Sequence, residues 1–172
     1  EVFKEEINDV SIAIGHTRWA THGKVLLENT HPILSENVAV VHNGIIENHD
    51  QIRLELKDKN VVFETSTDTE VIPHLLNLSK KKTNNFFDAC VSVVKKIEGA
   101  YAFAAIHSLK EEIFVARKTS PLVLGLGDGY NIVGSDAQSM SQIVNEVIYL
   151  NDGDYAILNK TNIQIYDFNN NE

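Results

Sequence analysis

The sequence is poor in several features that mark specialised classes of protein. One cysteine in 172 residues excludes an internal disulfide framework, a CxxC redox pair and a cysteine-rich zinc site, and it suits a reducing compartment. Nine glycines and three prolines form no flexible linker. The apolar runs are too short to cross a bilayer, and the first residues show no basic segment followed by an apolar one. We therefore expect a cytoplasmic protein without a signal peptide.

Positive charge is also scarce. Lys and Arg number 15 against 24 Asp and Glu, which gives a net charge of −9. Nucleic acids and anionic membranes both select for a positive face, so neither is an expected partner. The 43% of hydrophobic residues is typical of a folded chain, and a chain of this length can bury a core of its own. The sequence thus predicts one globular domain over residues 1–172.

The apolar periodicity changes twice along the chain. Short β-type runs at residues 11–14 and 38–41 flank a long polar loop. A helical period follows and predicts three helices: after Asn48, over 71–78 and over 86–97. Further strands are expected over 101–107, 112–116, 122–126, 131–134, 147–150, 155–158 and 163–168, with a short helix over 135–144. Many strands with a few central helices indicate a layered α+β fold.

The densest polar motif lies at residues 15–23, Gly-His-Thr-Arg-Trp-Ala-Thr-His-Gly, after the first β-type run. Arg18 offers a planar fork that suits a carboxylate, and Trp19 can cover a small ligand. The alternative is a surface loop in which Arg18 is extended and Trp19 is half-buried. Composition alone leaves both interpretations open.

A second motif, Asn43-Gly44, directly follows the run at 38–41. Asn-Gly is foremost a hairpin-turn dipeptide. The residues after it, however, lead into a helical pattern and not into an obvious return strand. An Asn side-chain amide beside a glycine N–H can instead present two donors to a developing oxyanion.

The third motif, Thr67-Asp68-Thr69-Glu70, has the spacing of a capping box at a helix start. Asp68 there could in addition bind a ligand ammonium.

Cys90 lies on the apolar side of the third predicted helix, so we expect a buried core residue and not a nucleophile. The seven histidines show no metal-ligand spacing, and the glycine-rich stretch at 125–129 is expected to be a hairpin turn.

Together and in this order, the three motifs closely resemble the glutaminase domains of glutamine–fructose-6-phosphate aminotransferases, which are class II glutamine amidotransferases. The resemblance extends over residues 11–167 and includes the stretches at 99–103, 120–125, 134–136 and 151–154. It implies the αββα sandwich of N-terminal-nucleophile hydrolases, in agreement with the layered α+β pattern. It implies no cofactor and no metal.

The resemblance also implies how glutamine is held. Arg18 corresponds to the residue that binds the α-carboxylate of glutamine, and Asp68 to the one that binds its α-ammonium. Trp19, Thr21 and His22 correspond to the loop that closes over the substrate. Two opposite charges on separate loops suit a zwitterion.

For catalysis, the resemblance implies an oxyanion hole made by the side chain of Asn43 and the backbone N–H of Gly44. The family's nucleophile is a cysteine at the mature N-terminus, whose own α-amine is its base. This sequence begins with Glu1, and Cys90 is expected in a helix. We therefore expect a partial domain that lacks the first strand with its nucleophile and that does not hydrolyse glutamine by itself.

In the whole enzyme, the resemblance implies that ammonia from glutamine converts fructose 6-phosphate to glucosamine 6-phosphate in amino-sugar biosynthesis. The sugar phosphate would bind a C-terminal isomerase domain that this sequence does not contain, and the enzyme would be a homodimer. Two alternatives stay open. One is the glutaminase domain of another class II enzyme, such as an amidophosphoribosyltransferase, and the other is a non-catalytic glutamine-binding module.

Overall fold

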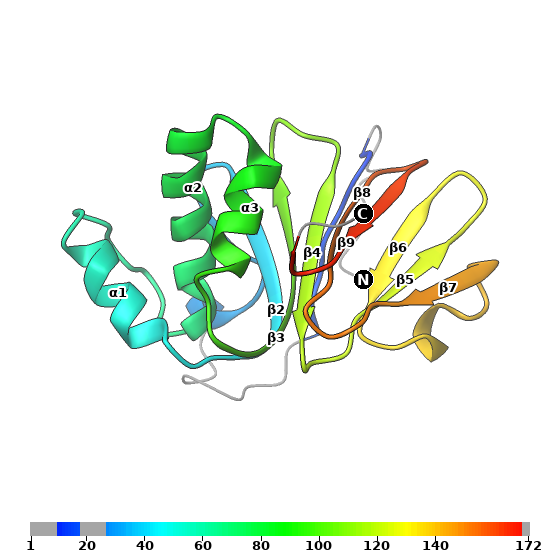
Figure 1. Cartoon of the computed structure of the whole chain (residues 1–172), viewed down its shortest axis with the longest axis horizontal. Coiled ribbons are helices and arrows are strands. Elements are labelled where there is room, and N and C mark those ends of the chain that lie inside the picture. Colours follow the sequence, from blue (N-terminus) through cyan, green and yellow to red (C-terminus); the bar gives the residue numbers. More distant parts are fainter. Residues whose placement is uncertain (1–9, 18–26, 170–172) are drawn as a thin grey trace.

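The computed structural model describes residues 10–17 and 27–169, and these form three layers. Helices lie on one face of a six-stranded sheet, and a three-stranded sheet lies on its other face (Figure 1). The predicted α+β class and its layered arrangement are confirmed.

The six-stranded sheet has the order β1-β2-β3-β4-β8-β9, and every neighbouring pair is antiparallel. Its strands are β1 (Ile33–Ser35), β2 (Val38–Ile46), β3 (Gly99–His107), β4 (Ile113–Lys118), β8 (Tyr155–Leu158) and β9 (Ile163–Tyr166). The two long central strands, β2 and β3, pair along nine residues each. They lie side by side inside the sheet, with β1 beyond β2 and β4 beyond β3.

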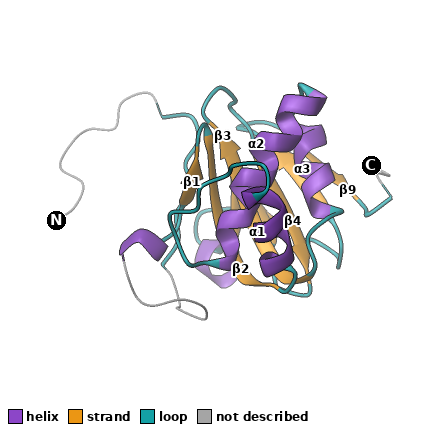
Figure 2. Cartoon of the chain, turned by 90° about the vertical axis from the view of Figure 1, so that its left-hand side faces the viewer, coloured by secondary structure: helices purple, strands orange, loops and turns teal. Residues whose placement is uncertain are grey.

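Helices α2 (Val71–Thr83) and α3 (Phe86–Val94) cover one face of this sheet, and α1 (His49–Lys57) packs against α2 on the same side (Figure 2). Asn85 caps α3, since its side chain accepts a hydrogen bond from the N–H of Phe87 at 3.0 Å. Alternate residues of β2, namely Val38, Val40 and Ile46, point into the same core.

Aromatic side chains fill the centre of this helix-facing core. The rings of Phe114 and Tyr155 stack with their centroids 5.7 Å apart, and Phe103 lies 6.0 Å from Phe114. All three side chains are at most 1% exposed. Burial of this size is the main stabilising contribution of the layer.

The smaller sheet has the order β6-β5-β7, built from β5 (Val123–Leu126), β6 (Asn131–Gly134) and β7 (Glu146–Tyr149). β5 and β6 form the hairpin predicted around residues 125–129, closed by a bond from Gly127 N–H to Tyr130 O. One face of this sheet packs on the six-stranded sheet through Leu124 and Ile148. The stacked sheets are the central ββ pair of the expected sandwich.

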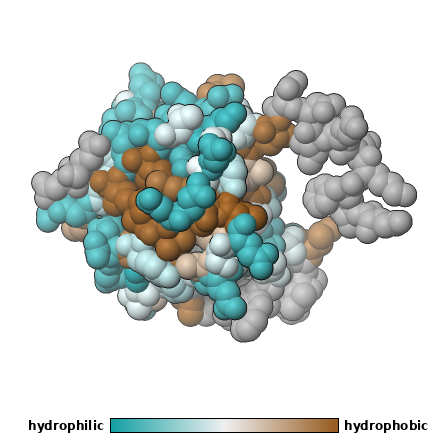
Figure 3. Space-filling view, turned by 90° about the vertical axis from the view of Figure 1, so that its right-hand side faces the viewer, coloured by the Kyte–Doolittle hydropathy of each residue, from teal (hydrophilic) through white to brown (hydrophobic). Residues whose placement is uncertain are grey.

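The other face of the smaller sheet carries one short 3-10 helix, η3 (Gln138–Met140), whose Met140 packs close to Gly125 and Gly134. Figure 3 looks onto this side of the molecule and shows apolar side chains gathered there. Ile143 and Val147, 54% and 38% exposed, are apolar residues of this sheet and the loop before it.

Several local predictions were wrong. Residues 11–14 form no strand; Ile12 and Ile14 instead pack against the core between the sheets. The helix expected over 135–144 is reduced to η3, and the third helix ends at Val94. β1 and a 3-10 helix, η1 (Leu27–Asn29), were not anticipated. Within the described part of the chain, no helix has the length and apolar character needed to cross a membrane.

Candidate active site

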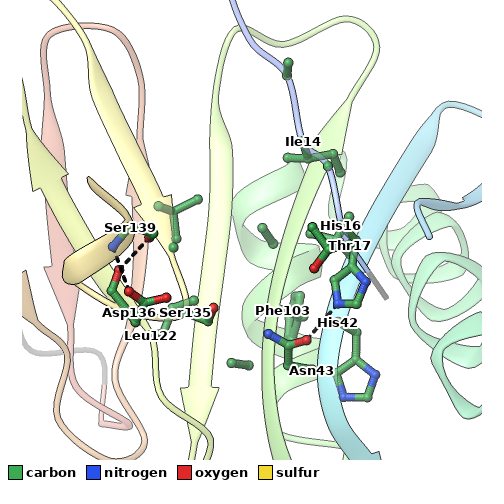
Figure 4. A pocket seen from close by; sticks show the side chains of 17 residues that line it. Ile14, His16, Thr17, His42, Asn43, Phe103, Leu122, Ser135, Asp136 and Ser139 are labelled. Carbon is green, nitrogen blue, oxygen red and sulfur yellow. Dashed lines mark hydrogen bonds between the residues drawn. The ribbon is translucent and has the colours of Figure 1, made fainter. Parts of the chain in front are cut away.

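Asn43 and Gly44 lie inside β2, not in a turn. They pair with Ala102 and Tyr101 of β3, so the hairpin-turn interpretation was wrong. The two-residue alternation of a strand turns neighbouring side chains to opposite faces. His42 is therefore buried on the helix side, while Asn43 points toward the smaller sheet (Figure 4).

Gly44 is required by close contact with β3. Its φ of +110° is one that other residues rarely adopt, and a Cβ at this position would lie 2.1 Å from the carbonyl oxygen of Ala100. The Oγ of Ser120 would be 2.9 Å away. No side chain fits here without movement of the β2–β3 backbone.

A cavity of about 630 Å³ lies between the two sheets, with Asn43 on its wall. Its lining comes from β2, β3, residues 13–17 and the end of β6 (Figure 4). Ser135 and Asp136 face Asn43 from the side of the smaller sheet. The cavity is large enough for an amino acid the size of glutamine.

His16 contacts Asn43 directly. Its Nε2 lies 2.7 Å from the Oδ1 of Asn43, although the two residues are 27 positions apart in the sequence. Figure 4 shows the amide nitrogen of Asn43 on the side away from His16, directed into the space between the sheets. An N–H donor is thus presented to anything that occupies the cavity.

Two more histidines, His31 and His42, contact one hydroxyl group near the helix-facing side of β2. The Oγ1 of Thr69 lies 2.8 Å from Nδ1 of His42 and 3.0 Å from Nε2 of His31. Burial lowers the pKa of His42 to about 4; the charge of Asp68 opposes this shift, and His16 adds to it. His42 is therefore neutral at pH 7.

The sequence motifs did not point to this group, because they suggested no role for His31 and His42 other than that of metal ligands. Among residues 10–17 and 27–169, no cluster of His, Cys, Asp and Glu has an arrangement that could hold a metal ion. A usable signal was present: His42 directly precedes Asn43 in a strand, where alternation must bury one of the two.

Asp68 braces the end of β2. It is 5% exposed, and its Oδ2 accepts a hydrogen bond from the N–H of Ile46 at 2.7 Å. Asp68 opens a 3-10 helix, η2 (Asp68–Glu70), that leads into α2. The structure thus brings the carboxylate to the strand that carries Asn43 and Gly44.

The predicted capping box is not formed. The side chain of Thr67 makes no cap hydrogen bond, and Glu70 bonds to the N–H groups of Glu64 and Thr65 at 2.7 and 2.8 Å. Burial alone would raise the pKa of Glu70, but hydrogen bonds from His74, from these two amides and from the Thr65 hydroxyl lower it to about 2. Glu70 fixes the preceding loop and does not cap the helix.

The remaining candidates divide into two groups. Cys90 is fully buried in α3, and burial raises the pKa of its thiol well above the usual range, as expected for a core residue. Four predicted substrate-binding residues lie outside the described part of the chain: Arg18, Trp19, Thr21 and His22.

A comparison with known families shows which family this chain belongs to. The glutamine amidotransferase domain family matches residues 16–142. The chain belongs to the glutamine amidotransferase domain family. The matched region contains Asn43, which lines the cavity, Gly44 beside it in β2, and Asp68, which accepts the N–H of Ile46.

Individual amidotransferases agree with this assignment. The chain is 47% identical over 165 residues to a glutamine–fructose-6-phosphate aminotransferase (isomerizing) from Idiomarina loihiensis, and 44% identical over 168 residues to one from Thermotoga maritima. Each match covers 95% of this chain but 27% of the relative. The chain thus spans about a quarter of the length of these curated relatives.

A solved amidotransferase has the same fold. The glutamine phosphoribosylpyrophosphate amidotransferase from B. subtilis superimposes with a TM-score of 0.74 at 28% identity, over 89% of this chain and 34% of that one. The fold is that of the N-terminal-nucleophile hydrolases, as the sequence predicted.

Proposed function

We propose that this chain is the glutamine-hydrolysing domain of an enzyme that converts fructose 6-phosphate to glucosamine 6-phosphate, with glutamine as the ammonia donor. The observation that carries the proposal is the 42–47% identity, over nearly the whole chain, to proteins named for that reaction. The identity to the phosphoribosylpyrophosphate amidotransferase is 28%. This difference favours the sugar-phosphate acceptor.

The geometry of β2 supports the hydrolytic role. When a nucleophile attacks the side-chain amide of glutamine, the carbonyl oxygen becomes an oxyanion. The Nδ2 of Asn43, directed into the cavity, and the N–H of Gly44 are proposed as its two donors. A pre-oriented donor of this kind stabilises the transition state by about 2.7–4 kcal/mol.

The other end of glutamine carries two opposite charges. Arg18 is proposed to bind the α-carboxylate and Asp68 the α-ammonium, with Trp19, Thr21 and His22 closing over them. Asp68 has a fixed position because it accepts the Ile46 N–H, so its second oxygen has a defined direction. A fixed carboxylate loses little entropy when it binds a cation.

The nucleophile is not Cys90, since its thiol is buried and protonated. We propose a cysteine at the mature N-terminus of the full-length protein. We further propose a sugar-phosphate isomerase domain in that protein, a homodimeric assembly and a place in the cytoplasm.

The test uses the full-length protein, assayed for glutamate release from glutamine and for glucosamine 6-phosphate formation with fructose 6-phosphate. We expect both products. Glutamate without the amino sugar would identify a different acceptor, and glutamine binding without glutamate would indicate a non-catalytic module.

A substrate-site variant extends the test. Arg18→Ala removes a charge-assisted pair to the α-carboxylate, which typically costs about 1.5–3 kcal/mol and raises KM for glutamine roughly tenfold to a hundredfold. Asp68→Asn keeps the acceptor for Ile46 N–H, so it should raise KM without loss of stability. An unchanged KM in either variant excludes that residue from the site.

A further inference from the structure

The contact between His16 and Asn43 determines which way the Asn43 amide faces. The Oδ1 of an asparagine only accepts hydrogen bonds, so at 2.7 Å the Nε2 of His16 must be the donor. In the tautomer with the hydrogen on Nε2, the opposite orientation would direct the amide N–H groups at the His16 N–H. The contact therefore favours the orientation that directs Nδ2 into the cavity (Figure 4).

This selection matters because an asparagine amide is nearly symmetric in shape. A rotation of 180° exchanges its oxygen and nitrogen with little change in packing. In the rotated state a partially negative oxygen would face the cavity wall where an oxyanion must be stabilised. A donor that discriminates between the two orientations converts a two-state side chain into a preorganised one.

His16 is itself held by a chain of contacts that begins in the helix-facing core. Its ring lies 4.6 Å from the ring of His31, centroid to centroid. His31 meets the hydroxyl of Thr69 at 3.0 Å, and Thr69 is 1% exposed. Thr69 follows Asp68 in η2, so the same short helix that braces β2 also supports His16.

We propose that His16 is a positioning residue for glutamine hydrolysis. With its hydrogen on Nε2, it fixes the amide of Asn43 with Nδ2 toward the reacting carbonyl, and His31 and Thr69 hold it in place. The inference rests on the proposed role of Asn43 as an oxyanion donor, and it adds a residue that acts only through Asn43.

The test compares His16→Leu and His16→Gln in the full-length protein. Leu cannot donate, so the amide samples both orientations, and we expect kcat for glutamate release to fall about tenfold to a hundredfold with KM for glutamine within about twofold. Gln supplies an N–H donor, and we expect it to recover most of the loss. His49→Leu, a histidine substitution in α1, is the matched control and should leave kcat unchanged.

A double variant shows whether His16 acts through Asn43. In the Asn43→Ala background there is no amide to orient, so His16→Leu should lower kcat no further. An equal drop in both backgrounds would overturn the inference, as would a wild-type kcat in His16→Leu alone. If the unmodified full-length protein releases no glutamate, the proposed function fails instead, and the role of His16 fails with it.

Discussion

The two faces of the six-stranded sheet differ: one is packed against helices, and the other borders a cavity. On the helix side, the side chains of Val38, Val40, His42 and Ile46 from β2 are all at most 4% exposed. On the opposite side, Asn43 borders a cavity of about 630 Å³. One set of alternate residues in β2 thus stabilises the fold, and the other set contains the side chain that borders the cavity. Substitutions on the two faces should therefore separate stability from turnover.

The largest effect is expected on the packed face. Phe114→Ala deletes a fully buried ring between Phe103 and Tyr155, which should cost about 3–5 kcal/mol of unfolding free energy. Urea unfolding measures this loss, and turnover per folded molecule should stay normal. Phe168→Ala, at a residue that is 54% exposed, is the control and should change stability little. Equal losses in both variants would contradict the assignment of the core.

The next largest effect is expected on the open face. Asn43→Asp keeps the size of the side chain but places an anion where the oxyanion develops, so kcat for glutamate release should fall about a hundredfold to a thousandfold. The melting temperature should stay near that of the wild type. Asn145→Asp, at an exposed position before β7, is the control for the added charge. A normal kcat in Asn43→Asp would remove Asn43 from the site.

An intermediate effect is expected at Glu70, which supports α2 from the packed side. Glu70→Gln replaces a carboxylate that accepts two backbone N–H groups, at a cost of about 1.5–3 kcal/mol at pH 7. The control is Glu146→Gln, at an exposed residue of β7.

The same residue predicts a pH dependence. The folded-state pKa of Glu70 is about 2, below its ordinary value of 4.5, so the unfolded chain binds a proton first as the pH falls. Its stabilising contribution is complete above about pH 5 and disappears toward pH 2. Unfolding measured from pH 7 to pH 3 should show a shallower loss in Glu70→Gln than in the wild type. Parallel curves would refute the shifted pKa.

The smallest effects are expected within α1. Ile52→Val, at a residue that is 1% exposed, should cost about 0.5–1.5 kcal/mol. Leu54→Gln, two residues away but 65% exposed, should stay within about 0.5 kcal/mol of the wild type. Denaturant midpoints of the two variants would show whether α1 presents the face to the core that the structure assigns.

Sequence patterns predicted elements whose determinants are local. The helical period placed α3, and the short β-type runs placed the strands that follow residue 100. Residues 11–14 alternate equally well but form no ladder, since Ile12 and Ile14 bury themselves between the sheets instead. The prediction of a capping box at Thr67 was wrong because the carboxylate of Glu70 accepts two backbone N–H groups of the preceding loop instead. Competition of that kind depends on tertiary contacts.

The candidate site was predictable in its parts but not in its contacts. Motifs identified Asn43, Gly44 and Asp68, and the structure places them around one end of β2. The pairing of His16 with Asn43 joins residues 27 positions apart. It depends on how the segment before the polar loop crosses the sheet, which no local pattern specifies. The contacts of His31 and His42 with the hydroxyl of Thr69 could not be predicted for the same reason.

The tight fit of Gly44 against Ala100 has a consequence for genetic experiments. Any library of amino-acid replacements at position 44 will report intolerance, because every Cβ meets the backbone of β3 whether or not the N–H binds an oxyanion. Such a result says nothing about catalysis. The informative change leaves the glycine shape intact and removes the hydrogen alone, by replacing Gly44 with glycolic acid so that an ester oxygen takes the place of the amide nitrogen. Semisynthesis, not mutagenesis, is the route to the chemistry of this residue.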